Sequence, residues 1–308
     1  MNNQMLQSAK MIGAGSKDQK ATLNFKRNGK IQLSVQCKSF VVRPERLSAQ
    51  NATAIIYFDN DSIYHPSLDF KYVNKDRQVS LIIDNSTGMS MPFFNSFHKV
   101  DMYVDGVYWK IDDPLMELKM ISGAGESKMW LESENLFSDD RFRQLQGLSD
   151  YNPLQLIYKY NKSYGDVIYS ATLAQMLGVA ESEAKSLMIF LANKGFLTYD
   201  AETSSAVAKD KVVYYLEAKT EKIDYDKIEI SSVISAKPNA KLNLLNFDLD
   251  MEGVSRVFLS DTQAVWVTPE NQQIKLKKNR DFEFSGKVHA GRSDFFGKKF
   301  EFIYDQFK

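Results

Sequence analysis

The segment from Tyr151 to Ala218 restricts the fold more than any other part of the sequence, because it combines helical spacing of apolar residues with clear start and stop signals. Pro153 is a favourable first helical residue, since its missing N–H is not needed there, and it predicts a helix that ends near Gly165. A short strand is expected over 167–169. The segment therefore predicts a compact unit inside a longer chain.

Two further helices are expected between Ser170 and Gly195. The Ser170 hydroxyl can accept an unpaired backbone N–H and predicts the N-cap of a helix over 171–177, which Gly178 ends in the left-handed conformation. Residues 182–194 predict the next helix, with Gly195 as its stop. Its apolar residues recur at the spacing of one buried face: Ala184, Leu187, Met188 and Leu191.

After these helices, residues 196–199 and 211–216 are expected to form two strands around a polar tip over 200–210. Two helices joined by a glycine-containing turn and followed by a hairpin resemble the winged helix-turn-helix family over 151–218. The resemblance implies an α/β module of a kind that often reads nucleic acid.

The charge of this segment disfavours nucleic-acid reading, because phosphate contacts need basic side chains. Its bases are Lys159, Lys162, Lys185, Lys194, Lys209 and Lys211, and its acids are Asp166, Glu181, Glu183, Asp200, Glu202, Asp210 and Glu217. It contains no arginine, the side chain that most often reads guanine. A nucleic-acid-binding protein is therefore the alternative interpretation, with contacts expected from Lys185, Asn193, Lys194 and Lys209.

The outer face of the 182–194 helix favours a protein partner instead. Ile189 lies at the middle of that face, with Lys185 and Asn193 beside it. A mixed apolar and polar patch suits a protein contact better than phosphate binding. The leading interpretation is a non-catalytic structural or protein-interaction component, whose partner the sequence does not identify.

The rest of the chain has the alternation typical of β-strands. Asn28-Gly29 is a strong hairpin signal between strands expected over 22–25 and 31–35. Further strands are expected over 54–58, 79–83, 100–104, 257–259, 264–267 and 274–276, and a short helix over 139–146.

The last forty residues alternate aromatic and polar side chains, with Gly286, Gly291 and Gly297 between them. Short strands with tight glycine corners are typical of stacked β structures. The predicted fold class is α+β overall: mainly β, as a β-solenoid, a β-roll or a sandwich, with the α/β module inserted. The expected organisation is a disordered segment over 1–20, a β-rich domain over 21–148, the module over 151–218, a polar link over 219–240 and a β-rich region over 241–308, which is left open as a continuation of the first.

Three segments, 59–66, 278–286 and 290–297, resemble parts of very large, uncharacterised exported proteins of Gram-negative bacteria. The resemblance implies a cell-envelope setting, with this chain as an internal part of a longer protein. It implies no activity and no catalytic residues. The first residues lack the apolar core of a signal peptide, which departs from the pattern of an exported chain.

Composition narrows the remaining classes. Basic and acidic residues are equal at 39 each, so no net charge draws the chain to polyanions. The single cysteine, Cys37, excludes an internal disulfide, and no apolar run is long enough to predict a membrane span. His65, His98 and His289 lie far apart without the spacing of metal ligands. The sequence predicts no metal and no cofactor.

Two other clusters suggest chemistry. Glu132 and Glu134 near Trp130 match the carboxylate pair and aromatic platform of a glycosidase, which gives a third interpretation, a carbohydrate-active enzyme. Adjacent acids on a solvated strand are the simpler explanation. The basic run Lys275, Lys277, Lys278 and Arg280 suggests a surface for an anionic polymer or lipid headgroup, against the simpler explanation of a charged strand face.

Overall fold

The computed structural model describes residues 11–15, 19–84, 88–121, 127–146, 151–235, 237–260 and 263–306. Of the segment expected to be disordered, residues 1–10 and 16–18 lie outside the described part. Met11–Ala14 forms strand β1, which pairs with Ser39–Val42 (β4).

The protein is mainly β, as predicted. The first β-rich region contains β2 (Ala21–Arg27), β3 (Lys30–Cys37), β5 (Arg46–Phe58), β6 (Asp61–Val73), β7 (Gln78–Ile82), β8 (Phe93–Asn95), β9 (Val100–Tyr103), β10 (Gly106–Lys110), β11 (Leu115–Lys119) and β12 (Ser127–Ser133). The second contains β16 (Glu229–Ile234), β17 (Ala240–Asn243), β18 (Leu249–Met251), β19 (Val257–Ser260), β20 (Val265–Pro269), β21 (Ile274–Leu276), β22 (Phe282–Ala290) and β23 (Ser293–Phe302). Short 3₁₀ turns lie at Glu270–Gln272, Lys278–Arg280 and Tyr304–Gln306.

The strands of both regions belong to one antiparallel sheet that closes on itself. The pairings lead from β6 through β7, β10, β11, β17, β18, β21 and β22, and return through β20, β19, β16, β12, β9 and β8 to β6. All strand pairs described are antiparallel, whereas the turns of a solenoid stack in parallel. The expected β-solenoid or β-roll stacking is therefore wrong, and the two β-rich regions are continuous.

Two long strands close this circuit because each pairs on one side with two different strands. The Asp69–Val73 half of β6 pairs with β7, and Ile63 and Tyr64 pair with β8. In the same way β22 pairs first with β21 and then, from Gly286 onwards, with β20. The register shifts beside both halves, in the β5–β6 and β22–β23 pairs, and such bulges bend a strand.

The strands expected in this sheet from local signals are all present. Asn28 and Gly29 both have positive φ, 51° and 79°, at the turn between β2 and β3, which confirms the predicted hairpin. The strands expected over 54–58, 79–83, 100–104, 257–259, 264–267 and 274–276 correspond to β5, β7, β9, β19, β20 and β21.

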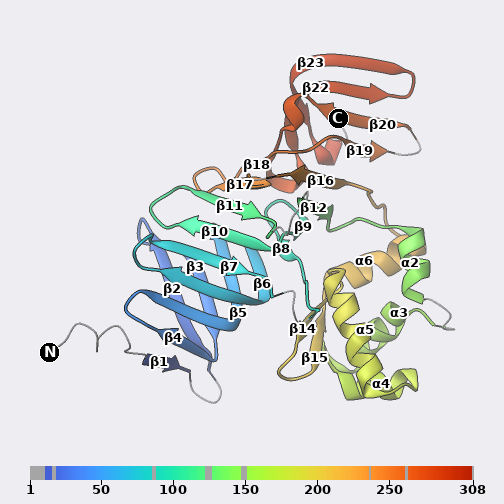
Figure 1. The fold of residues 1–308 in the computed structure, drawn as a ribbon. Coiled ribbons are helices and arrows are strands. Elements are labelled where there is room, and N and C mark those ends of the chain that lie inside the picture. Colours follow the sequence, from blue (N-terminus) through green and yellow to red (C-terminus); the bar gives the residue numbers. More distant parts are fainter. Residues whose placement is uncertain are drawn as a thin grey trace.

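A helical region leaves the sheet after β12 and returns to it at β16. It contains α2 (Asp139–Gln146), α3 (Pro153–Tyr164), β13 (Val167–Tyr169), α4 (Ser170–Leu177), α5 (Glu181–Asn193), β14 (Leu197–Asp200), β15 (Ser205–Ala208) and α6 (Asp210–Lys219). β12 and β16 are antiparallel neighbours, with Glu132 opposite Glu229. The helices therefore gather on one side of the sheet, with β14 and β15 between them and it (Figure 1). Because β16 falls inside 219–240, the expected polar link contains a strand of the sheet.

Most boundaries of this region agree with the sequence. α3 begins at Pro153, and Gly178 ends α4 with φ 67°. The helix expected over 139–146 is α2. Two expectations are wrong. Tyr169 takes the N-cap place of α4, while the Ser170 hydroxyl donates to Glu181 Oε1 at 2.8 Å.

The second error concerns 211–216, which was expected to be a strand and lies in α6 instead. Lys211, Val212, Tyr215 and Ala218 are the buried side chains of this helix, and their spacing is helical. The second strand of the hairpin is β15, and β13, β15 and β14 form a separate three-stranded sheet.

The sheet and the helical region have separate hydrophobic cores. Trp109, Phe58 and Phe70 are among the largest side chains of the sheet core, while Phe196, Tyr215 and Met188 lie in the core of the helical region. None of the helices described here combines the length and the apolar character needed to cross a membrane.

Candidate functional site

The two cores meet at a buried ionic cluster, formed by Asp101, Glu132, Arg141 and Lys211. Lys211, in the first turn of α6, places its ammonium 2.6 Å from Asp101 Oδ2 and 3.4 Å from Glu132 Oε2. Arg141 on α2 donates to both oxygens of Glu132, at 2.9 and 2.8 Å. Asp101 and Glu132 come from β9 and β12, so each ion pair joins the helical region to the sheet.

Electrostatics favour the charged forms of Glu132 and Lys211, whereas burial of Asp101 outweighs the attraction of Lys211 and raises the pKa of that carboxyl. Burial opposes ionisation of Glu132, but Lys211 and Arg141 outweigh it and lower the pKa of that carboxyl. Burial likewise opposes protonation of Lys211, and the two carboxylates outweigh it and raise the pKa of the lysine. Loss of one partner of such a buried ion pair strongly destabilises a protein, because the other charge stays buried without compensation.

Gly195, which follows α5, lies against the ionic cluster. Its φ is 77°, a conformation that side chains with a Cβ adopt with difficulty. A Cβ at this position would stand 2.6 Å from Asp101 Oδ2 and 3.3 Å from Lys211 Nζ. Gly195, which was predicted to end a helix, therefore also allows the Asp101–Lys211 ion pair to lie close to the backbone.

An aromatic pocket of about 290 Å³ opens on one side of the ionic cluster. Tyr103 and Trp130 form one wall, with rings stacked 4.7 Å apart at 8°. Phe190 of α5 lines the same pocket and is 44% exposed. The other apolar residues of the lining are Ile83, Met91, Val104 and Met120. The pocket is thus shared between the sheet and α5, with Glu132 at its inner end.

A more polar pocket, of about 320 Å³, is lined by Asp101, Lys209 and Lys211. Lys209 Nζ lies 4.1 Å from the centroid of the Phe94 ring, and burial lowers the pKa of this lysine. Lys99 and Glu134 form an ion pair of 3.4 Å in the same lining. Three lysines and three acids line this pocket, so it has no uniform charge.

The three residues predicted to contact a protein partner have different surroundings. Ile189 is half-buried and packs against the core of the helical region, so the large exposed apolar side chain of this helix is the next one, Phe190. Lys185 pairs with Glu181 at 3.2 Å. Asn193 donates to the Gly88 carbonyl at 2.8 Å and accepts from the Ser90 N–H at 2.8 Å. These two hydrogen bonds connect α5 to the segment between β7 and β8.

The residues predicted to contact nucleic acid do not line one pocket. Asn193 and Lys194 line the aromatic pocket, whereas Lys209 lines the polar one. Lys194 lies with its ammonium 5.9 Å from the Phe190 ring centroid. Lys185 forms an ion pair with Glu181, which lies in the first turn of α5. In a winged-helix reader α5 would be the helix that enters the DNA groove.

The carboxylates of the proposed glycosidase pair also lie apart. Glu132 faces the aromatic pocket with both oxygens held by Arg141, and Glu134 faces the polar pocket beside Lys99. A general acid needs a raised pKa, and that of Glu132 is lowered. Glu132 is therefore not suited to the role of general acid.

The histidines lie at three separate places. His65 accepts from Ser67 N–H and contacts the Met91 carbonyl at 3.0 Å, and His98 is buried next to Asn95. His289 lies on β22, 2.7 Å from Asp294. Among the described residues, no three histidine, cysteine or acidic side chains are grouped in a way that could hold a metal ion.

The basic run of the sequence is neutralised by neighbouring acids. Lys275 lies 3.4 Å from Asp250, Lys277 pairs with Glu283, and Lys278 lies 3.5 Å from Asp61. Arg280 is buried, donates to Ser133 Oγ at 2.9 Å and lies 3.3 Å from Asp226 Oδ2. Each base of the run therefore has an acidic neighbour, which favours the simpler explanation of a charged strand face over a surface for an anionic polymer or headgroup.

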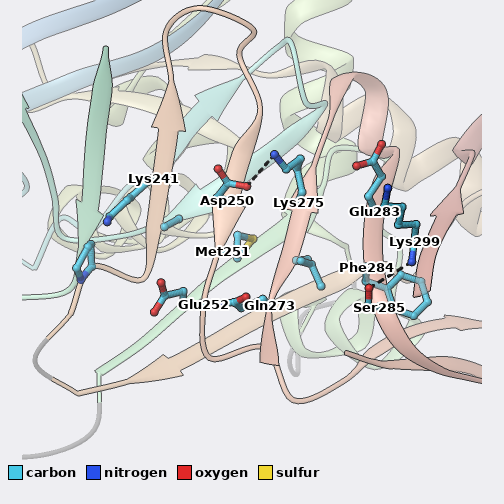
Figure 2. A pocket seen from close by; sticks show the side chains of 13 residues that line it. Lys241, Asp250, Met251, Glu252, Gln273, Lys275, Glu283, Phe284, Ser285 and Lys299 are labelled. Carbon is cyan, nitrogen blue, oxygen red and sulfur yellow. Dashed lines mark hydrogen bonds and ion pairs between the residues drawn. The ribbon is translucent and has the colours of Figure 1, made fainter. Parts of the chain in front are cut away.

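The largest of the pockets described, about 350 Å³, lies on this balanced face (Figure 2). Across four neighbouring strands the registered residues are Lys241, Asp250, Lys275 and Glu283, so opposite charges alternate from β17 to β22. Opposite charges facing each other stabilise the register of adjacent strands. We therefore assign this row to the sheet rather than to a ligand.

Sequence reasoning missed the ionic cluster, because its members come from four elements and Lys211 lies 110 residues from Asp101. The one local signal is Lys211 itself, which occupies a buried position of α6 at helical spacing from Tyr215 and Ala218. A lysine on an apolar helical face indicates a buried acidic partner. No family model, curated protein or solved structure matches this chain.

Proposed function

We propose that the chain is a non-catalytic interaction protein that holds one apolar side chain of a protein partner in the aromatic pocket between α5 and the sheet. The observation that carries this proposal is the exposed ring of Phe190 at a pocket walled by Trp130 and Tyr103. Aromatic residues and methionine in a preformed pocket are typical of the anchor sites of protein interfaces.

We further propose that 151–218 is a winged-helix-like module that serves this contact. The order α3, β13, α4, α5, β14 and β15, with β13 at one edge of the small sheet, supports that interpretation. The position equivalent to a groove-reading helix would be α5. Its first turn carries Glu181 and Glu183, which favours a protein partner over phosphate. The cell-envelope setting implied by the sequence resemblance stays a prediction.

The pocket volume sets the size of the occupant. About 290 Å³ is at the lower end of the range for small-molecule sites, and it fits one large side chain rather than a polymer. Lys128 and Lys194 approach the Trp130 and Phe190 rings at 5.9 Å. Asp105 and Glu132 also line the pocket, so the charges around it favour neither an acidic nor a basic partner segment.

The test is selection of displayed random peptides on the intact chain, with a Phe190→Lys variant for counter-selection. We expect selected peptides to share an aromatic or leucine anchor, to bind with weak salt dependence, and to lose binding to the variant. Lys185→Ala, on the same helix but away from the pocket, is the matched control and should bind as the parent does. Peptides indifferent to Phe190→Lys would contradict the pocket. Tight binding to duplex DNA that falls steeply with salt would instead establish the nucleic-acid alternative.

A further inference from the structure

β23 is the outermost strand at one end of the sheet. Among the strand pairings described, it takes part in one, with β22. In Figure 1 the β22–β23 hairpin projects beyond the body of the protein, with β23 on its outer side. Most of its ten residues are exposed. A long strand with one unpaired edge is a template for pairing with another strand.

The hairpin geometry determines which backbone groups face outward. Gly291 and Arg292 form a two-residue turn, with Ala290 opposite Ser293 as its closing pair. Backbone groups in an antiparallel pair alternate, so Ser293, Phe295 and Gly297 direct their N–H and C=O groups to β22. Asp294 and Phe296 direct theirs to solvent, and Lys298 follows at the bulge opposite Ser285.

The same three residues, Asp294, Phe296 and Lys298, place their side chains on one face, because side chains alternate along a strand. Phe296 is 78% exposed. Asp294 reaches back to His289 at 2.7 Å and to Lys287 at 3.4 Å, while Lys298 forms no ion pair among the described residues. An acid, which also contacts Lys287 and His289 of β22, and a base therefore stand two residues before and after an exposed aromatic residue.

This pattern is complementary to itself. If a second copy of β23 lies antiparallel with Phe296 opposite Phe296, each Asp294 stands opposite Lys298 of the second copy. A twofold axis through the two rings then repeats every contact, as an isologous interface requires. Stacked aromatic pairs and opposite charges are both favourable across neighbouring strands.

We propose that two copies of this chain associate through antiparallel pairing of β23 about Phe296. The occupant of the free edge is a second copy because the charges of 294–298 match their own reversed order. The pairing ends after Lys298, because Lys299 has φ 57° and its N–H donates to Ser285 Oγ at a bulge. The interface is therefore short, and we expect dimerisation to depend on the concentration of the chain.

Sedimentation velocity on the intact chain, over a dilution series through the micromolar range, tests the proposal. We expect the mass to rise with concentration towards that of two chains. Phe296→Asp should abolish the rise. Tyr164→Asp is the matched control, since Tyr164 on α3 is equally exposed, at 78%, and should not alter it.

A charge exchange separates strand pairing from nonspecific association. Asp294→Lys and Lys298→Asp should each weaken dimerisation by roughly tenfold, since the twofold axis repeats each like-charge pair. The two substitutions together restore opposite charges across the axis and should restore dimerisation. A monomer at every concentration, a dimer that survives Phe296→Asp, or a double variant no better than the single ones would each overturn the proposal. Far-UV circular dichroism of each variant checks that the sheet is intact.

Discussion

The ammonium of Lys211 lies 2.6 Å from the carboxylate of Asp101, although 110 residues separate them in the sequence and both side chains are buried. This contact joins the first turn of α6 to β9. Glu132 lies within reach of the same ammonium and is also held by Arg141 on α2. The helical region is therefore attached to the sheet by charge as well as by covalent connection.

Lys211→Met should destabilise the protein by about 3–5 kcal/mol, because Asp101 and Glu132 would keep buried charges with less compensation. Urea unfolding measures this free energy. Lys219→Met is the control, since Lys219 pairs with Asp139 at 2.8 Å on the surface and should cost less than about 1 kcal/mol. Adding Asp101→Asn to Lys211→Met should recover part of the loss. Equal effects of Lys211→Met and Lys219→Met would show that the buried cluster is not the attachment.

Gly195→Ala should destabilise the protein more than Gly178→Ala. Both glycines have left-handed backbone, with φ 77° and 67°, so each change carries the cost of that conformation, about 1–2 kcal/mol. A Cβ at Gly178 meets nothing within 4 Å, whereas one at Gly195 would stand 2.6 Å from Asp101 Oδ2. The difference between the melting temperatures of the two variants measures the cost of the contact between the added Cβ and Asp101. Similar losses in both variants would mean that the ion pair shifts aside freely.

Two buried histidines should make stability depend on pH. Burial lowers the pKa of His65 to about 4 and that of His98 to about 3, while both lie near 6.5 in an unfolded chain. Between these values the unfolded chain binds more protons, so stability is complete above about pH 6.5 and falls as the pH drops.

Each histidine should contribute a slope of about 1.4 kcal/mol per pH unit over that window. Unfolding free energies from urea titrations at pH 7, 6 and 5 measure it, and pH 8 against pH 7 should show no change from these groups. His65→Gln should reduce the slope by about 1.4 kcal/mol per pH unit, whatever its effect on the free energy of unfolding at pH 7. A slope unchanged by this substitution would show that His65 is not the titrating group.

Asn193→Ala should loosen α5 from the sheet. It removes two hydrogen bonds, to Gly88 and Ser90, and should cost about 1–2 kcal/mol. Hydrogen exchange at the Ser90 amide should rise in the variant, because that N–H loses its acceptor. Lys185→Ala removes an exposed pair of the same helix and should cost about 0.5 kcal/mol or less. Unaltered exchange at Ser90 would contradict the role given to Asn193.

Local sequence signals predicted most turns and helix ends correctly. Features that depend on contacts between residues far apart in the sequence could not be predicted in this way. Pro153, Gly178 and the Asn28-Gly29 turn act within a few residues, so each was placed correctly. The run after Lys211 was not, because its valines and tyrosines favour strands, although the spacing of its buried residues is helical. Ile189 and Phe190 differ by one helical step, and the packing of α5 determined which of them is exposed.

The closed course of the sheet was also beyond sequence reasoning, because it depends on β6 and β22 pairing with two neighbours each. Alternation of apolar and polar residues indicates which segments are half-buried strands, but it does not indicate the order of those strands in the sheet. The pockets at the junction therefore could not be assembled from motifs alone.

The helical region enters and leaves the sheet at neighbouring points, since Glu132 on β12 lies opposite Glu229 on β16. Tension applied along the chain on either side of this region would therefore pass directly between the two strands, through their backbone hydrogen bonds. The helices would stand outside the path of the load. Under stretching, the sheet would bear the force while the helical region stayed folded, until the β12–β16 ladder itself opened.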